Sequence, residues 1–428
     1  MIDRELVVSK CARALIPFIA LLYFVNYIDR VNVSFAALTM NKDLAFSPAV
    51  YGLGAGIFFW GYLLFQIPAN VVLVRLGARR WIFLIMAVWG AISTATAFVQ
   101  TPAGFYAVRF LLGVAEAGFF PGMVMYLTYW FPQSYRARFI AGFMIAIPLA
   151  FVVGAPISGF ILQMEGVLSL HGWQWLFLLE GFPAFLLSFV VLKFLPDGPA
   201  DAPWLTSDER ADISARLAAD ASSLNQEFWP ALLDPRVWAL GFIYFGINFG
   251  RYGVELWLPQ IIQGMGFSIL ATTFVVAVPY GLGIAAMIYW GRLSDLKGER
   301  IWHVALPSLA AAAGCAIASF ATNDAVVLLA LGTVVISLLA VQGPFFSLPS
   351  VYLAGTAAAG GIGLVNTLGT GAGGLLGPAV IGALKQQSGS YGSSMAVLAL
   401  GLLGSASIAL LLGRLKGRTA AVPSSLKG

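Results

Sequence analysis

The chain carries seven ionisable side chains inside stretches that are otherwise apolar. They are Asp29, Arg30, Arg109, Glu116, Glu180, Arg251 and Glu255. A charge at the centre of a lipid bilayer costs at least about 2.5–3.5 kcal/mol on insertion scales. Such side chains therefore face the interior of a helix bundle or a water-filled cavity, and they pair with other groups. These seven residues are the first candidates for a functional site.

Two of the apolar stretches arrange their polar residues at helical spacing. In the first, Asn26 and Arg30 are four residues apart and therefore share a helix face. In the other, Arg109 and Glu116 lie seven residues apart on one stripe. Gly113 lies between them, and its lack of a side chain allows another backbone to approach closely.

These residue types predict a site for an anion that also handles protons. The guanidinium groups of Arg30 and Arg109 would bind a carboxylate, because their planar fork fits it and keeps its charge when buried. Asp29 and Glu116 are the predicted proton carriers, since a carboxyl group away from water takes up a proton more readily. The alternative is that these residues form static buried ion pairs that fix helix packing.

Further polar residues extend the candidate site. Arg251 and Glu255 are four residues apart on one stretch, so either they neutralise each other or Arg251 also meets the ligand. Tyr62 and Asn366 are added as binding candidates. For Glu180 we expect a structural partner.

The composition indicates that lipid surrounds the elements that hold these residues. Of the 428 residues, 60% are hydrophobic and only 10% are charged, whereas soluble globular chains have about 25% charged residues. A bilayer core of about 30 Å needs about 20 mostly apolar residues per helix. Each span is expected to be a helix, because an isolated strand would leave its backbone groups unpaired in lipid.

The length rule predicts an all-α membrane protein with twelve spans in two bundles of six. The first six are expected near 14–37, 50–73, 81–100, 104–128, 138–163 and 174–195. The second six are expected near 237–262, 269–291, 302–321, 325–347, 358–384 and 393–413.

One long polar segment separates the two sets of spans. It predicts three parts: a bundle over 1–195, a cytoplasmic linker over 196–235, and a bundle over 236–428. Ser207 is placed to cap a short amphipathic helix over 207–221.

Lysine and arginine predict the orientation of the chain. With both termini in the cytoplasm, the outer loops carry only Lys42 and Lys385, and the remaining basic residues outside the spans lie inside. This asymmetry accounts for the net charge of +5 without a nucleic-acid partner. It favours a multi-pass protein of the bacterial inner membrane, and we expect a monomer.

A repeat relates the two halves at an offset of about 221 residues. The matched positions are Gly77 with Gly298, Tyr23 with Tyr244, Arg30 with Arg251, and, at 222, Pro156 with Pro378. Parallel repeats of six spans place a substrate site near the middle of the membrane at their interface.

Catalytic and metal-binding patterns are missing from the sequence. The two cysteines, Cys11 and Cys315, are far apart, and His171 and His303 are the only histidines. They provide neither a disulfide framework nor metal-ligand spacing, and no Ser–His arrangement is present. We expect no cofactor, no metal and no enzymatic activity.

Two loops resemble the signature G-x-x-x-D-R-x-G-R-R of the major facilitator superfamily. The second copy is GRLSDLKGER at 291–300, and the first ends in RLGARR at 75–80, with Asn70 and Val74 where the signature has Gly and Asp. The resemblance implies a gating role for a set of six residues. They are Gly77, Arg79, Gly291, Asp295, Gly298 and Arg300.

Longer motifs are similar to the anion:cation symporter branch of that superfamily. They are NYIDRVN at 26–32, RFLLGVAEAGFFPG at 109–122, GWQWLFLLEG at 172–181 and WLPQ at 257–260. Members of this branch carry sugar acids, tartrate and other hydroxy acids, and aromatic acids. The resemblance implies that Arg109 binds a substrate carboxylate with Tyr27, Arg30, Tyr62 and Asn366 nearby. Charged residues at 251 and 255 depart from the small or uncharged residues expected there.

Together these patterns predict proton-coupled uptake of a small organic anion by alternating access. The anion would be a hydroxy-dicarboxylate, a sugar acid or an aromatic acid. An exporter or an exchanger is the alternative within transport. A non-transporting membrane receptor is the alternative of a different class, and the small soluble fraction of the chain argues against it.

Overall fold

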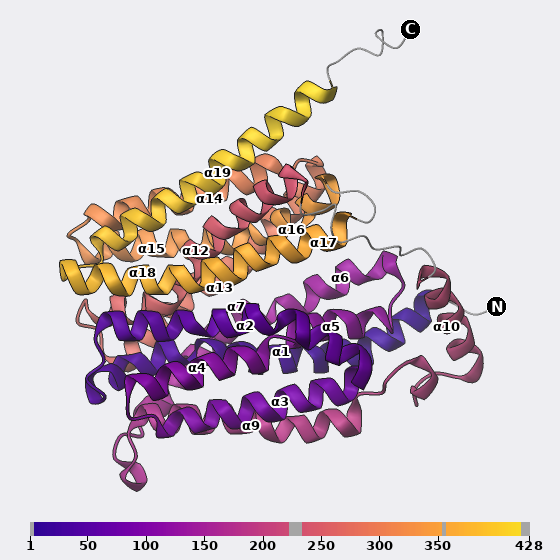
Figure 1. Ribbon diagram of the computed structural model, residues 1–428, viewed down its shortest axis with the longest axis horizontal. Coiled ribbons are helices and arrows are strands. Elements are labelled where there is room, and N and C mark those ends of the chain that lie inside the picture. The colour runs from indigo at the N-terminus through magenta and orange to yellow at the C-terminus, as the bar shows by residue number, and fades with distance from the viewer. Residues whose placement is uncertain (1–3, 222–232, 353–356, 421–428) are drawn as a thin grey trace. The chain divides into compact units, whose positions relative to one another are not determined.

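The computed structural model describes residues 4–221, 233–352 and 357–420, and these ranges contain helices but no strand (Figure 1). Eleven of the helices are long and apolar enough to cross a membrane. The twelfth expected span is α12 (Pro235–Gln263), a continuous helix of 29 residues. It carries Arg251 and Glu255 within an otherwise largely apolar sequence. The predicted all-α fold with two bundles of six helices is confirmed.

The first six spans occupy the chain up to residue 194. Spans one and two are α1 (Arg4–Asp43) and α2 (Pro48–Leu76). Span three joins α3 (Ala78–Ala95) to η1 (Thr96–Phe98), and span four joins α4 (Pro102–Glu116) to α5 (Phe119–Thr128). Span five consists of α6 (Gln133–Met144), α7 (Ala146–Leu149), a π-helical turn over Ala150–Gly154, and α8 (Ala155–Leu162). The short turn η3 (Val167–Ser169) precedes span six, α9 (Gly172–Phe194).

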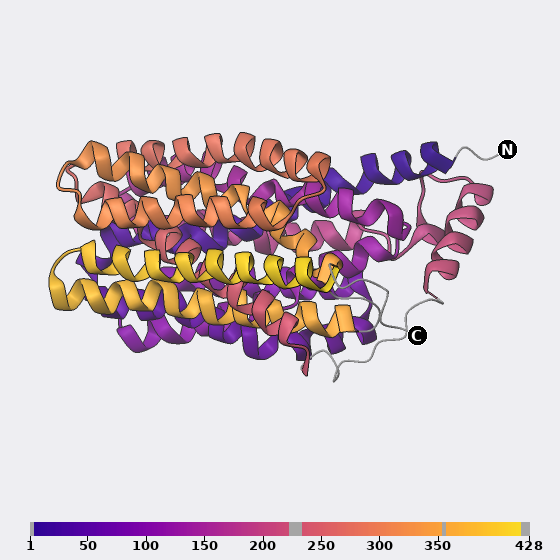
Figure 2. The same ribbon diagram turned by 90° about the horizontal axis from the view of Figure 1, so that it is seen from above.

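The second set of spans follows α12. Spans eight and nine are α13 (Ile269–Lys297) and α14 (Ile301–Phe320). Span ten joins α15 (Asp324–Ala340) to α16 (Gln342–Tyr352). Span eleven joins α17 (Ala357–Asn366), a π-helical segment over Thr367–Ala372, and α18 (Gly373–Ser388). Span twelve is α19 (Gly392–Ala420), which pairs with α18 through the turn at Gly389 (Figure 2).

The polar segment after α9 contains η4 (Pro199–Asp201) and the predicted helix, which is α10 (Ser207–Ala221). The cap differs from the prediction. Thr206, rather than Ser207, accepts a hydrogen bond from the Glu209 backbone N–H and donates its own backbone N–H to the Glu209 side chain. This reciprocal pair is a capping box, which satisfies two backbone donors at once. Residues 222–232 of the predicted linker lie outside the described ranges.

Packing divides the chain into two units. Unit 1 comprises 1–46, 57–225 and 266–277, and unit 2 comprises 47–56, 226–265 and 278–428. The first residues of α2 therefore pack within unit 2, and the first residues of α13 pack within unit 1. In unit 2, Gly52 approaches Pro378 and Gly382, and in unit 1 Gly159 approaches Thr273. A side chain at either glycine would collide with these neighbours.

The sequence repeat reappears in the positions of helices. The first and last residues of α13, 269 and 297, each follow those of α2, 48 and 76, by 221 residues. Spans five and eleven are both interrupted by a π-helical segment. Gly77 and Gly298 both have a left-handed backbone, with φ of 79° and 62°, which glycine adopts without strain.

The interior of unit 1 is fixed by the antiparallel packing of α3 against α9 (Figure 1). Gly90 lies against Phe185, and Gly181 lies against Ser93 and Thr94. Small residues at these contacts let the two backbones approach closely. This packing brings the buried face of α3 towards α1, which also packs on α9.

Candidate functional site

Glu116 of α4 forms a buried ion pair with α1. Its Oε2 accepts hydrogen bonds from Nη2 of Arg30 at 2.9 Å, Nε of Arg30 at 3.2 Å and Nδ2 of Asn26 at 3.0 Å. Glu116 is fully buried, and Arg30 is 7% exposed. Asn26 and Arg30 thus share a helix face, as their spacing predicted. The pair joins residues that are 86 positions apart in the sequence.

The aromatic ring of Phe58 on α2 lies against the two buried arginines of unit 1, Arg30 and Arg109. The guanidinium carbon of Arg109 lies 4.9 Å from the ring centroid, and that of Arg30 lies 5.3 Å away. Such cation–π contacts strengthen when they are desolvated, and Arg109 is only 1% exposed. A Cβ on Gly113 would lie 1.9 Å from the Phe58 carbonyl oxygen. The predicted close approach at Gly113 therefore brings α2 against α4.

Two tyrosines complete the surroundings of Arg30. Its guanidinium carbon lies 5.7 Å from the ring of Tyr27 and 5.3 Å from the ring of Tyr62. Both tyrosines are buried. The structure thus gathers five of the predicted binding and proton-coupling residues in unit 1: Tyr27, Arg30, Tyr62, Arg109 and Glu116.

Asp29 faces a different helix from Arg30. Its Oδ2 accepts a hydrogen bond from Trp89 Nε1 at 2.6 Å, and its Oδ1 accepts one from Ser93 Oγ at 2.8 Å, both on α3. Asn32 Nδ2 donates a longer bond of 3.4 Å to Oδ1. Asp29 is fully buried, and these three partners are neutral.

Glu180 of α9 has a neutral neighbour as well. Ser158 Oγ on α8 donates to Glu180 Oε1 at 2.7 Å. Glu180 is 7% exposed. The Ser158 contact ties α8 to α9.

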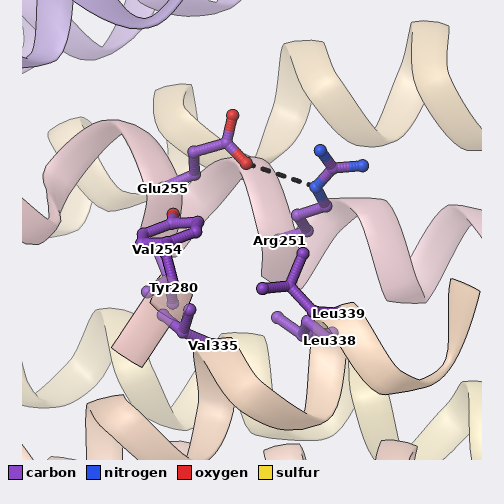
Figure 3. Close-up of a pocket in the computed structure, with 7 residues that line it drawn as sticks. All are labelled: Arg251, Val254, Glu255, Tyr280, Val335, Leu338 and Leu339. Atoms are coloured by element: carbon purple, nitrogen blue, oxygen red, sulfur yellow. Dashed lines mark hydrogen bonds and ion pairs between the residues drawn. The ribbon is translucent and has the colours of Figure 1, made fainter. Parts of the chain in front are cut away.

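In unit 2, Arg251 and Glu255 form an ion pair within one helix. Arg251 Nε lies 3.2 Å from Glu255 Oε2, and both residues are buried. The pair borders a cavity of about 10 Å³, room for about one water molecule, whose other walls are mostly apolar (Figure 3). The other lining residues are Val254, Tyr280, Val335, Leu338 and Leu339.

Asn366, the remaining binding candidate, ends α17 where the π-helical segment begins. Its Oδ1 accepts a hydrogen bond from Thr370 Oγ1 at 2.9 Å. Both residues belong to unit 2, so the predicted binding residues are distributed over the two units.

The residues of the predicted gating motif other than Gly291 lie at or near the ends of helices. Gly77 begins the turn into α3, and Arg79 donates to the Leu192 carbonyl. In the second copy, Arg300 forms an ion pair of 2.6 Å with Asp295, beside the left-handed Gly298. Gly291 lies in α13. A Cβ added to Gly343 would lie 3.8 Å from the Gly291 Cα.

Outside the spans, a histidine lies between two carboxylates where α1 and α9 meet. His171 Nδ1 lies 2.7 Å from Glu165 Oε1, and Nε2 lies 3.4 Å from Asp43 Oδ1. The bond to Glu165 raises the pKa of His171. The pKa of Glu165 is lowered, first by the backbone N–H of Gly172 and also by His171.

Sequence reasoning missed the partners of the buried charged residues. Phe58, Trp89, Ser93 and Ser158 were not selected as site residues, although Trp89 and Ser93 lie four residues apart within a predicted span. The spacing of Trp89 and Ser93, which places two hydrogen-bond donors on one face of an apolar helix, was the signal that could have identified them. Within the described part of the chain, no three His, Cys, Asp or Glu side chains gather closely enough to hold a metal ion.

Comparison with known proteins places this geometry in a family. Residues 19–378 match the Major Facilitator Superfamily. A protein of Agrobacterium vitis named "Putative tartrate transporter" is 47% identical over 411 residues, which cover 95% of each chain. A protein of Acinetobacter baumannii named "Quinolone resistance transporter" is 38% identical over 91% of each chain.

A solved structure supports the fold independently. The crystal structure of a bacterial homolog of the human lysosomal transporter Spinster matches with a TM-score of 0.76 at 17% identity, covering 96% of this chain and 97% of the other. The family match spans most of the sequence, and the helices that it requires are present. The chain belongs to the major facilitator superfamily and is an integral membrane transporter of that family.

Proposed function

We propose that this transporter takes up a small organic anion together with protons. The observation that carries the proposal is the buried pair between Arg30 and Glu116, next to a second buried arginine, Arg109. Two guanidinium groups at one aromatic ring form a cationic patch that a substrate carboxylate would neutralise with bidentate bonds. The name of the Agrobacterium relative, which refers to tartrate, supports a carboxylate substrate.

Proton coupling follows from competition for Arg30. An ionised Glu116 occupies Nε and Nη2 of Arg30 through one oxygen. Protonation would weaken these bonds and leave Arg30 with a charge that a substrate carboxylate can balance. Binding of a proton to Glu116 would therefore raise the affinity for the anion. By thermodynamic linkage, binding of the anion would raise the affinity for the proton by the same factor. Asp29 is the second proposed proton carrier.

The substrate class that fits best is a hydroxy-dicarboxylate, a sugar acid or an aromatic acid. Tyr27 and Tyr62 would contribute hydroxyl groups and ring faces beside Arg30. Arg251 and Asn366 are proposed as further contacts from the second half of the chain. Arg251 would bind a second carboxylate of the substrate if that carboxylate replaced Glu255 as its partner.

Transport would proceed by alternating access. The bundle over 1–195 would rock against the bundle over 236–428, with 196–235 as a cytoplasmic linker and the two glycine-containing loops as gates. A monomer in the bacterial inner membrane with cytoplasmic termini is the proposed arrangement. The ion pair between Asp295 and Arg300 would have to rearrange if the second loop opens.

Uptake into proteoliposomes tests the proposal. An inward proton gradient should drive accumulation of radiolabelled tartrate or another carboxylate, and a protonophore should abolish it. Glu116→Gln should retain exchange of labelled for unlabelled anion but lose accumulation, because the amide cannot carry a proton. Accumulation that withstands both the protonophore and Glu116→Gln would refute proton coupling.

Export is the second candidate function. The name of the Acinetobacter relative, which refers to quinolone resistance, supports it. Export driven by an inward proton gradient would require the proton and the substrate to bind in alternation at Arg30 and Glu116, rather than together. Loading vesicles with labelled carboxylate and, separately, with a labelled quinolone distinguishes the two: proton-driven efflux of the quinolone without carboxylate uptake would favour the exporter.

A further inference from the structure

Span four is interrupted directly after Glu116. The helix α4 ends at Glu116, and the backbone N–H of Ala117 reaches the Val114 carbonyl at 3.4 Å, three residues back instead of four. Gly118 follows with φ of −94° and ψ of 0°, and α5 begins at Phe119. The interruption therefore places the buried acid of the proposed proton site at the C-terminal end of a helix.

Pro121 accounts for the interruption. A proline has no backbone N–H, and its ring collides with the carbonyl of the residue four positions earlier, which is Ala117. Pro121 is the third residue of α5, where the missing N–H is tolerated because the first turn of a helix has no intrahelical acceptor for it. Gly118 supplies the room, since a Cβ there would lie 2.8 Å from Trp81 Cζ2 and 2.9 Å from Ala69 Cβ. The local sequence thus ends one helix and starts the next within a single span.

Span ten repeats this interruption without an acid. Its first helix, α15, ends at Ala340, and α16 begins at Gln342. Pro344 is the third residue of α16, as Pro121 is the third residue of α5, and the two prolines are 223 positions apart, close to the offset of the repeat. The last turn of α15, residues 337–340, has the sequence SLLA and carries no charge. The proline interruption is therefore common to both halves, whereas the acid at its edge belongs to span four.

The end of a helix acts on an acid that lies there. The last carbonyl groups of a helix have no N–H partner within it, and together they carry a partial negative charge. This charge disfavours an ionised carboxylate in the last turn, and a low dielectric strengthens the effect for a buried group such as Glu116. The protonated acid is neutral and is not disfavoured in this way. In an unbroken span the same carboxyl group would lie in mid-helix, where the carbonyl groups are paired.

The charged neighbours of Glu116 do not depend on the interruption. From α1, Arg30 bonds to its Oε2, and Asp29 adjoins Arg30 in the sequence. Arg109 lies two turns earlier on α4 itself. On α2 the titratable neighbour is Tyr62, whose ring lies beside Arg30. The described part of α3 presents neutral donors to Asp29, and α5 carries no charged residue. A substitution within the interruption leaves all of these groups in place.

We infer that Pro121 is a positioning residue for proton exchange: it ends α4 at Glu116 and thereby sets the pH range in which this acid takes up and releases its proton. The inference rests on the proposed role of Glu116 and adds a residue that acts on it through the course of the backbone. With the interruption, Glu116 gives up its bond to Arg30 at a higher pH than it would in an unbroken helix.

Infrared titration of the full-length protein in lipid vesicles tests the inference. The C=O stretch of a protonated carboxyl group lies apart from that of a carboxylate, and the component that Glu116→Gln removes belongs to Glu116. In Pro121→Ala the restored N–H can bond to the Ala117 carbonyl, and the midpoint of this component should fall by about 0.5–1 pH unit, the size of a helix-end effect. Pro344→Ala is the matched control, because it restores the same N–H in span ten and should leave the midpoint unchanged.

Two results would overturn the inference. Equal midpoints in Pro121→Ala and the unaltered protein would mean that the end of α4 does not act on Glu116. Equal shifts in Pro121→Ala and Pro344→Ala would mean that the effect does not depend on the acid at the interruption. If Pro121→Ala does not fold, Pro121→Ser restores the same N–H and takes its place.

The titration separates this inference from the proposed function. It needs no anion, so a failed uptake assay leaves the spectra interpretable. A midpoint that stays in place in Pro121→Ala removes the role of Pro121 and leaves proton-coupled uptake standing. A spectrum that Glu116→Gln leaves unchanged would instead contradict the proposed role of Glu116, and with it the inference.

Discussion

The two units use the same helical scaffold but place their buried charges differently. In unit 1, five charged side chains lie on α1, α4 and α9, and Arg30 bonds to Glu116 across two helices. In unit 2, Arg251 bonds to Glu255 one turn away on the same helix. An ion pair between helices changes when the helices move or when a ligand competes, whereas a pair within one helix moves as a whole. The difference supports the proposal that proton and anion exchange at the pair in unit 1.

The repeat makes this comparison direct. Arg30 and Arg251 are 221 positions apart, the same offset that relates α2 to α13. Equivalent arginines therefore have different partners. The charges of the unit 2 pair also cancel, whereas unit 1 has one more buried acid than buried cations among its described residues.

The largest expected effect is at Arg109. Arg109→Lys keeps the charge but removes the planar fork, and losing about 3 kcal/mol of charge-assisted bonding would reduce uptake roughly 100-fold. Arg251→Lys should reduce uptake less than about tenfold, because an ammonium can still pair with Glu255. Initial rates in proteoliposomes measure both. Equal losses in the two variants would remove the distinction between the units.

Gly113→Ala should disturb the contact between α2 and α4 that holds Phe58. Its Cβ would meet the Phe58 carbonyl at 1.9 Å, and overpacking of this kind typically costs about 1–3 kcal/mol. We expect a lower melting temperature and slower uptake. Gly404→Ala on α19 is the matched control, since no atom lies within 4 Å of its Cβ position. Equal melting temperatures for the two variants would show that this helix contact tolerates widening.

Glu255→Gln should destabilise unit 2 by about 2 kcal/mol, because Arg251 loses a charged partner in a buried position. The double variant Arg251→Leu, Glu255→Leu should recover most of that loss, since apolar side chains of similar size often replace a buried pair well. Thermal melting in detergent compares the three proteins. If the double variant is less stable than Glu255→Gln, the ion pair stabilises the fold by more than the cancellation of its two charges.

The smallest expected effect is the pH dependence of the Glu165–His171 contact. The raised pKa of His171 gives stability that is complete below its ordinary value of 6.5 and is lost as pH rises through the folded value. The lowered pKa of Glu165 gives stability that is present above its ordinary value of 4.5 and is lost as pH falls. The contact therefore contributes most between pH 4.5 and 6.5. His171→Gln should flatten the fall of the melting temperature above pH 6.5, where the contact is lost as His171 deprotonates. An unchanged pH profile in this variant would exclude the contact as the cause of that fall.

The sequence predicted the buried charged residues because lipid excludes charge wherever it occurs. All seven ionisable residues selected within the spans are buried. Their partners could not be read in the same way. The contact of Arg30 with Glu116, and that of Asp29 with Trp89, depend on how α1 packs against helices 60 to 90 residues away.

Local features of the helices show the same limit. The offset of 221 residues anticipated the matching bounds of α2 and α13. The π-helical turns in spans five and eleven were missed, because a turn that gains one residue leaves no clear trace in hydropathy. At α10 the predicted range was right, but Thr206 rather than Ser207 is the cap, since the reciprocal bond with Glu209 favours the residue three positions earlier.

Proton uptake on anion binding tests the central claim most directly. Tartrate, or the carboxylate that the uptake assay identifies, would be added to purified protein in weak buffer, and the pH change would be recorded. The exchange at Arg30 predicts that the protein takes up protons as the anion binds and that Glu116→Gln binds the anion without this uptake. Binding that leaves the pH unchanged in the unaltered protein, or equal proton uptake in both, would contradict the account.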